Sequence, residues 1–198
     1  MTKSLFKVVR SKKCFTLGPN MNIFFLSLNP QICAKYYCDQ HVNKILLEIV
    51  QMLYTALHHL GSDGWDKQAP FNVKRTRRGY RKAHSNHPMT MWVRSSRENY
   101  LFTTQLGICL ALEFHRRYHH CHACSKHILW LYNNIPEKFE LVESVKAYYS
   151  TLGYPTKLTR IPECMPEQYH TENIVDAYTS FYRGEKLKFA RWKAQGGP

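Results

Sequence analysis

The sequence predicts a mainly α-helical protein that forms a single compact domain, with one short N-terminal strand and a long basic loop. Its 198 residues are enough for one domain with a substantial core, and a second full domain is not expected. The contents of 44% hydrophobic and 14% aromatic residues are typical of a folded globular chain. Apolar residues recur at helical spacing in several long segments, whereas only one apolar run has the length of a strand.

The N-terminal part of the chain divides into an arm and a strand. Residues 1–20 contain five lysine or arginine side chains and no acidic one, and a Gly-Pro-Asn turn separates them from the apolar run 21–28. We interpret them as a basic arm rather than a signal or transit peptide, because the apolar run ends in Asn-Pro instead of a small-residue cleavage site. This run is the predicted strand and begins a helical domain that covers residues 21–193. Residues 194–198 are predicted to be a flexible tail.

Capping residues predict two helices after the strand. Asn29 before Pro30 is an N-cap and N1 pair, so a short helix should follow. Asp39 is expected to cap a main helix that runs to about Leu60, where the Gly-Ser-Asp-Gly segment 61–64 ends it.

The middle of the chain predicts a loop and a second long helix. Residues 65–85 show neither helical nor strand periodicity. A cap-then-proline turn at residues 86–88 restarts ordered structure, and Ser96 begins a helix that continues to about Tyr118. This helix is apolar nearly all round from residue 106 to 112, so we expect it to be the central buried helix.

Three shorter helices are expected in the C-terminal part, separated by proline-containing loops. They cover residues 124–133, residues 137–152 and a segment capped by Thr171 that carries apolar residues to about position 182.

The charge of the chain indicates a polyanionic partner. Lysine and arginine number 28 against 14 acidic residues, which gives a net charge of +14. Nucleic acid, DNA or RNA, is the partner that we expect, ahead of an anionic membrane surface. From Lys67 to Lys82, both included, there are seven basic residues and no acidic one. The side chains expected to contact nucleic acid are Lys74, Arg75, Arg77, Arg78, Tyr80, Arg81, Lys82, Trp92 and Arg94.

The cysteines and the hydropathy indicate an intracellular protein. Seven cysteines form an odd set without the regular spacing of a disulfide framework, in a chain long enough not to need one. No apolar run approaches the roughly 18 residues needed to span a bilayer, so no membrane-spanning helix is expected, and a membrane is not the partner that we predict.

One stripe of the predicted helix 39–60 carries side chains that can perform chemistry. At about 100° per residue, the side chains opposite its apolar face are His41, Lys44, Glu48 and Gln51. A solvated face with a Lys44–Glu48 pair is an equally good interpretation.

The catalytic interpretation gives each polar group a role. A desolvated Lys44 would be the nucleophile at a sugar carbon, as in a glycosylase/lyase. Glu48 or Asp39 would stabilise the resulting positive charge. His41 or His87 would transfer protons, although His87 can equally be only the cap of its helix.

No cofactor is expected, and the alternative is a structural zinc ion in the segment from His119 to His127. Cys121 and Cys124 have the spacing of half a zinc knuckle, but a second pair at finger distance is missing. A basic, histidine-rich turn beside phosphate is the interpretation that we prefer.

Several motifs occur together in a characteristic order. They are Asn29-Pro30, Cys38-Asp39-x-His41-Val42-x-Lys44, Asn86-His87-Pro88 with Trp92, Glu113 with Arg117-x-x-His120, and Ala177-Tyr178 through Tyr182-x-x-Glu185-Lys186. From about residue 21 to residue 193 the chain thereby resembles a family of small uncharacterised proteins of bacteriophages and large DNA viruses. The resemblance implies a viral setting, in the cytoplasm or nucleus of a host cell or in the virion, and it assigns no reaction.

We therefore expect a nucleic-acid-binding protein that is an enzyme acting on a base or nucleotide. Two alternatives remain. One is a non-catalytic nucleic-acid-binding or packaging protein, and the other is an enzyme that processes small-molecule nucleotides. Convergence of the predicted catalytic side chains in one concave pocket would favour an enzyme, and dispersal would favour a binding protein.

Overall fold

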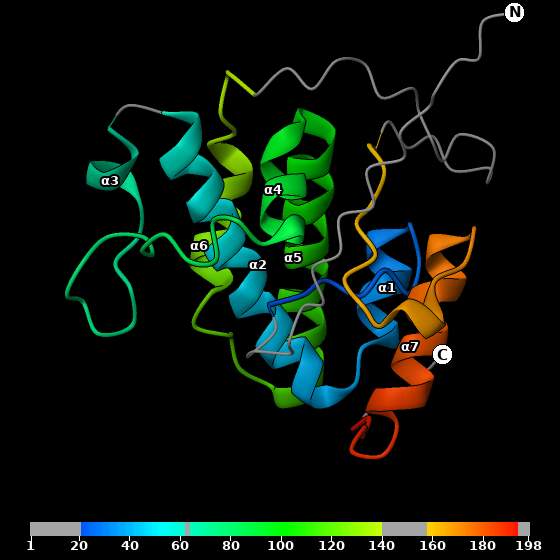
Figure 1. Ribbon diagram of the computed structural model, residues 1–198. Helices are drawn as coiled ribbons and strands as arrows, with labels where there is room; N and C mark the ends of the chain where they lie inside the picture. The colour runs from blue at the N-terminus through cyan, green and yellow to red at the C-terminus, as the bar shows by residue number, and fades with distance from the viewer. Residues whose placement is uncertain (1–20, 62–63, 140–157, 194–198) are drawn as a thin grey trace, which may run out of the picture.

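The computed structural model describes residues 21–61, 64–139 and 158–193, and these form a mainly helical fold, as expected (Figure 1). Within these ranges the chain has seven α-helices and no β-strand. The predicted arm 1–20 and tail 194–198 lie outside the described residues, and so does most of the predicted helix 137–152. Residues 137–139, the part of it that is described, are not helical.

Two long helices form the centre of the fold. Helices α2 (Asp39–Leu60) and α5 (Arg97–Tyr118) have 22 residues each and pack against one another. Helices α4 (Pro88–Ser95) and α6 (Ser125–Asn133) pack against both, and α1 (Pro30–Tyr36) packs against α5. Figure 1 shows the basic loop and α7 (Ile174–Lys186) on opposite sides of the α2–α5 pair.

A glycine allows three of these helices to meet. A Cβ atom on Gly107 of α5 would lie 2.5 Å from Cδ1 of Ile128 in α6 and 3.1 Å from Cγ2 of Ile49 in α2. Ile49, Leu106 and Ile128 have no exposed surface. The central position of α5 that the sequence predicts is therefore confirmed on the side of Gly107. The prediction of burial nearly all round from residue 106 to 112 is wrong, because Leu112 is 67% exposed.

Most of the predicted helix ends are confirmed by the capping bonds. Asn29 Oδ1 accepts hydrogen bonds from the N–H groups of the first turn of α1, and Ser96 Oγ accepts one from Asn99 N. Gly61 ends α2 in the left-handed region, at φ 67°. The cap predicted at Thr171 is wrong, because Asn173 has the extended backbone and accepts the capping bonds of α7. Asp39 is likewise the first residue of α2 rather than its cap.

The apolar run 21–28 is buried but is not a strand. Within the described residues it pairs with no neighbouring strand, and side chains satisfy its backbone instead. Asn22 N donates to Glu48 Oε2 at 3.0 Å, and the Tyr37 hydroxyl accepts from Phe24 N at 2.8 Å and donates to Phe24 O at 2.7 Å. An apolar run of this length fits a buried extended segment as well as a strand.

A buried arginine joins the N-terminus of α2 to α5. The Arg117 side chain has no exposed surface and donates to Glu113 Oε1 at 2.6 Å and to Asp39 Oδ1 at 3.0 Å. It also donates to the backbone carbonyls of Tyr37 and Lys35. The backbone N–H of residue 193 donates to the same Asp39 carboxylate at 3.2 Å, so the C-terminal segment depends on this group as well.

We expect Arg117→Met to lower the free energy of unfolding by about 3–5 kcal/mol, because it leaves the Asp39 carboxylate buried without its cation. Arg116→Met is the matched control, since the Arg116 side chain is 47% exposed and binds the same Glu113. It should cost at most about 1 kcal/mol. Urea unfolding of both variants measures the difference, and equal losses would contradict a structural role specific to Arg117.

Candidate functional site

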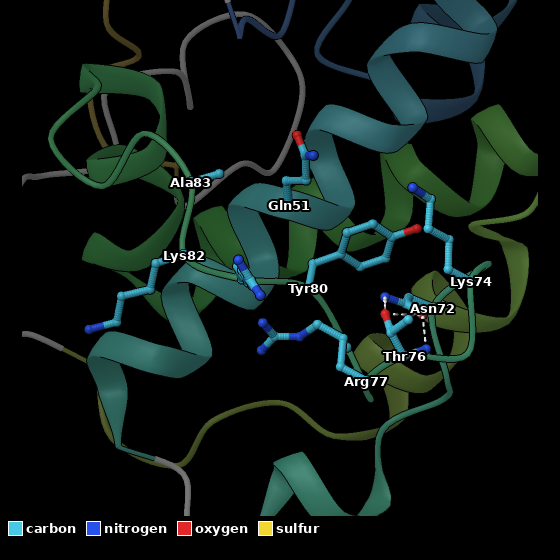
Figure 2. A pocket seen from close by; sticks show the side chains of 10 residues that line it. Gln51, Asn72, Lys74, Thr76, Arg77, Tyr80, Lys82 and Ala83 are labelled. Carbon is cyan, nitrogen blue, oxygen red and sulfur yellow. Dashed lines mark hydrogen bonds between the residues drawn. The ribbon is translucent and has the colours of Figure 1, made fainter.

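The basic loop forms a cleft against α2. The cleft has a volume of about 430 Å³, and Figure 2 shows the side chains that surround it. Gln51 of α2 forms one wall, and the other lining residues come from the loop: Asn72, Lys74, Thr76, Arg77, Gly79, Tyr80, Arg81, Lys82 and Ala83. Four of them carry a positive charge and none carries a carboxylate. A volume in the range of small-ligand sites and this lining suit an anionic group.

Close packing and hydrogen bonds hold the start and the bend of the loop. Residues 65–85, which show no periodicity in the sequence, begin with a one-turn helix, α3 (Trp65–Gln68). Further along, Phe71 forms an isolated antiparallel bridge with Arg78. Gly79 has a φ of 59°, and a Cβ atom there would lie 2.7 Å from the rings of both Trp65 and Tyr54. Only glycine fits this position without displacing the two rings.

The far end of the loop is bound to α2. Ala83 N donates to Thr55 Oγ1 at 3.0 Å, and His58 Nε2 lies 3.1 Å from the carbonyl oxygen of Tyr80. Within the loop, Asn72 Oδ1 accepts from Thr76 N at 3.1 Å, one of the bonds drawn in Figure 2. Hydrogen bonds to the backbone of the loop, rather than the charged side chains that line the cleft, therefore hold the cleft in shape.

The cations predicted to contact nucleic acid have different positions in the loop. Lys74, Arg77, Arg81 and Lys82 line the cleft, and Arg75 is exposed but outside it. The Nε–H of Arg77 is buried and has no hydrogen-bond acceptor among the described residues. A buried donor of this kind costs free energy unless a ligand or water accepts its hydrogen bond.

Three of the predicted contact residues are structural in this conformation. The Arg78 guanidinium lies 4.1 Å from the centre of the Phe71 ring and donates to the Ala69 carbonyl at 3.0 Å. Trp92 is 4% exposed, and its Nε1–H donates to a backbone carbonyl, so its ring cannot stack on a base. Arg94 is 8% exposed and donates to the Ser85 carbonyl at 2.6 Å, which fixes the end of the loop.

Tyr80, the tyrosine predicted to contact nucleic acid, lines the cleft. Tyr80 is half-buried, with its ring 5.8 Å from that of Tyr54 and its hydroxyl 3.6 Å from Cys124 Sγ. One face of this ring belongs to the core packing, and Figure 2 shows the side chain at the centre of the cleft wall.

The structure does not bring the five predicted catalytic side chains into one cavity. Asp39 is held in the network of Arg117, and His87 Nδ1 accepts the capping bond from Met89 N at 3.2 Å. Lys44 is 57% exposed and lies 3.3 Å from Glu48 Oε1. Of the predicted stripe, only Gln51 lines the cleft.

The stripe itself is partly buried rather than a solvated face. Glu48 is 7% exposed, and burial raises its pKa against the opposing hydrogen bond from Asn22 N–H and the charge of Lys44. His41 is 6% exposed, and its Nδ1 lies 2.7 Å from the Tyr182 hydroxyl. Burial, together with the charges of Lys186 and Lys44, lowers the pKa of His41 to about 4.

Sequence reasoning missed Lys186 and Tyr182 as neighbours of His41. Both are on α7, one helical turn apart, and they lie beside α2 only because the chain returns to it after more than 130 residues. Their spacing of four residues predicts that they are neighbours on one helix, but no sequence pattern predicts that α7 lies against the polar stripe of α2.

The histidine- and cysteine-rich segment does not converge on one point. Cys124 and His127 are buried, with His127 Nδ1 2.9 Å from the Tyr54 hydroxyl, whereas Cys121 is exposed. Among the described residues, no three histidine, cysteine or acidic side chains are grouped so that they could hold a metal ion. The six described cysteines are free thiols. In the same part of the chain, no helix is both long and apolar enough to cross a membrane.

No protein-family model matches the chain, and no curated protein or solved structure matches it either. The resemblance to phage and large DNA virus proteins therefore stays a prediction.

We expect the buried imidazoles to make the protein less stable in mild acid. Burial, and secondarily Lys126, also lowers the pKa of His127 to about 4, against an unperturbed value of 6.5. As the pH falls from about 6.5 to about 4, His41 and His127 gain protons in the unfolded chain but not in the folded one. The contribution of these imidazoles to the free energy of unfolding is therefore fully present above pH 6.5. It decreases as the pH falls through this range, by up to about 1.4 kcal/mol per pH unit for each imidazole.

Urea unfolding at a series of pH values tests this expectation. His41→Gln and His127→Gln should each flatten the dependence on pH between 6.5 and 4. His115→Gln is the control, because its ring is exposed, and it should keep the slope of the wild-type protein. An unchanged slope in both buried-site variants would show that these imidazoles titrate alike in the two states.

Proposed function

We propose that the protein binds nucleic acid, with the cleft between the basic loop and α2 as the site that holds the phosphate backbone. The observation that carries this proposal is the lining of the cleft, which has four cations and no carboxylate. A protein surface usually mixes charges of both signs, whereas a ligand site for phosphate concentrates positive ones.

The hydrogen bonds that hold the loop support a role in binding nucleic acid. The residues that shape the cleft make their own hydrogen bonds, so the ammonium and guanidinium groups of Lys74, Arg81 and Lys82 extend into solvent. Arg77 adds a buried Nε–H without an acceptor in the described part of the chain. Phosphate oxygens can accept from all four groups, and the release of counterions supplies sequence-independent affinity.

Binding is better supported than catalysis. The cleft wall contains no carboxylate or histidine that could act as a general base, and the five side chains expected to be catalytic do not share a cavity. An enzyme acting on a base or nucleotide remains the second candidate. The observation that favours it is that neutral His41, Glu48 and Lys44 lie on the same helix as Gln51, one to three turns from the cleft.

We expect replacement of Lys74, Arg77, Arg81 and Lys82 by alanine to weaken binding to mixed-sequence oligonucleotides. The slope of log K against log salt should fall by about 3 to 4, because each of the four cations that bound a phosphate would have contributed about 0.7 to 0.9. Fluorescence anisotropy at several salt concentrations measures both the affinity and the slope, on single and double strands.

A matched variant removes four other exposed cations: Lys35, Arg97, Lys126 and Arg183. It carries the same net charge as the cleft variant, so it should retain most of the affinity if the cleft is the site. Equal losses in the two variants would mean that only net charge matters. Absence of binding by the wild-type protein at about 50 mM salt would end the nucleic-acid proposal.

A further inference from the structure

The lining of the basic cleft contains groups that phosphate binding does not use. Besides its four cations, the cleft is lined by the aromatic ring of Tyr80, the carboxamides of Gln51 and Asn72, a threonine and two small residues. Phosphate oxygens accept hydrogen bonds from cations and N–H groups, and the negative face of an aromatic ring does not attract them. The ring therefore indicates a second kind of contact in the same cleft.

The fold holds the Tyr80 ring in a fixed position. Its centroid lies 5.8 Å from that of Tyr54 and 5.0 Å from that of His127, and its hydroxyl lies 3.6 Å from Cys124 Sγ. These contacts cover only part of the side chain, which is half-buried and lines the cleft with the remainder. A ring that is already fixed loses little conformational entropy when a flat ligand stacks on it.

Gln51 supplies a carboxamide that the fold does not use. Its place at the cleft wall is set by α2, whose apolar side is buried. Among the described residues its side chain makes no hydrogen bond, and the Thr55 hydroxyl donates to its backbone carbonyl instead. By contrast, Asn72 uses its carboxamide within the loop, because Oδ1 accepts from Thr76 N and Nδ2 donates to Thr76 Oγ1. A free carboxamide has a donor and an acceptor side by side, which matches the edge of a base.

The dimensions of the cleft suit one nucleotide rather than a duplex. Its volume of about 430 Å³ is in the range of small-ligand sites. In a duplex the bases are stacked inside, so a base cannot enter a concave site unless it leaves the stack. The bases of a single strand can turn outward, stack on an aromatic side chain and form hydrogen bonds along their edges. The volume, the fixed ring and the free carboxamide therefore indicate the same ligand, an unpaired base.

We propose that the cleft takes one unpaired base of a single-stranded nucleic acid, stacked on Tyr80 and hydrogen-bonded along its edge by Gln51. This proposal rests on the phosphate-binding function proposed above, because the cations of the cleft hold the phosphates on either side of that base. Figure 2 shows the Tyr80 ring between Gln51 and Arg77. The buried Nε–H of Arg77, which has no acceptor among the described residues, gains one from an oxygen of the bound nucleotide. Every base has a flat face, so stacking accepts several sequences.

Fluorescence anisotropy of the full chain with strands of equal length separates the base from the phosphates. The probes are a single strand, a strand of abasic residues, which keeps every phosphate, and a duplex. The wild-type protein should bind the intact single strand at least about fivefold more tightly than the abasic strand, the factor that corresponds to the low end of the stacking free energy of one base. Deoxyribose and ribose versions of the single strand distinguish DNA from RNA as the ligand.

Substitutions at the two side chains test their separate roles. Tyr80→Leu should weaken binding of the single strand at least about fivefold, without changing the salt slope or the affinity for the duplex, because no phosphate contact is lost. Gln51→Leu should weaken it about two- to tenfold, the loss expected for one hydrogen bond. Tyr132→Leu is the matched control, since Tyr132 is exposed on α6 and does not line the cleft. It should bind like the wild-type protein.

The aromatic NMR spectrum of the wild-type chain gives a readout that does not depend on any variant folding. A stacked base should move the ring-proton signals of Tyr80 upfield, and the abasic strand should leave them in place. Unmoved Tyr80 signals, equal affinities for the intact and abasic strands, or a free nucleoside monophosphate that binds as tightly as the strand would overturn the proposal. The phosphate site would still stand if the variant without the four cleft cations lost affinity, so the two failures can be told apart.

Discussion

The ion pairs and hydrogen bonds of the buried Arg117 guanidinium are the interactions on which the rest of the structure depends. The guanidinium connects α5 to the first residue of α2 through Asp39 and to the end of α1 through two backbone carbonyls. Asp39 also receives the N–H of residue 193, and its own N–H donates to the Arg191 carbonyl at 2.8 Å. The same buried ion pair, between Asp39 and Arg117, therefore holds both the start of α2 and the C-terminal segment that returns to it.

Helix α2 extends from this junction to the basic cleft. Its C-terminal half holds the basic loop through Thr55 and His58 and supplies Gln51 to the cleft. Its N-terminal half places His41 against Tyr182 of α7. The polar stripe is thus not one active site, because only Gln51 reaches the basic cleft, and the apolar side of the same helix is buried.

Interactions between residues close together in the sequence could be predicted, whereas those between distant residues could not. Helix ends at Asn29, Ser96 and Gly61 follow from side-chain and backbone bonds within a few residues, so the sequence indicates them directly. The ion pair of Asp39 with Arg117 spans 78 residues, and no local pattern reveals it. The aromatic ring of Trp92 and the charge of Arg94 predict contacts with nucleic acid, but tertiary packing buries both side chains.

Binding of nucleic acid in the basic cleft is tested by lysine-specific covalent labelling, read by mass spectrometry, with and without excess oligonucleotide at low salt. If nucleic acid binds in the cleft, Lys74 and Lys82 are protected and the labelling of Lys126, which is exposed on α6, is unchanged. Unchanged labelling of both cleft lysines, or protection confined to the lysines of residues 1–20, would contradict it.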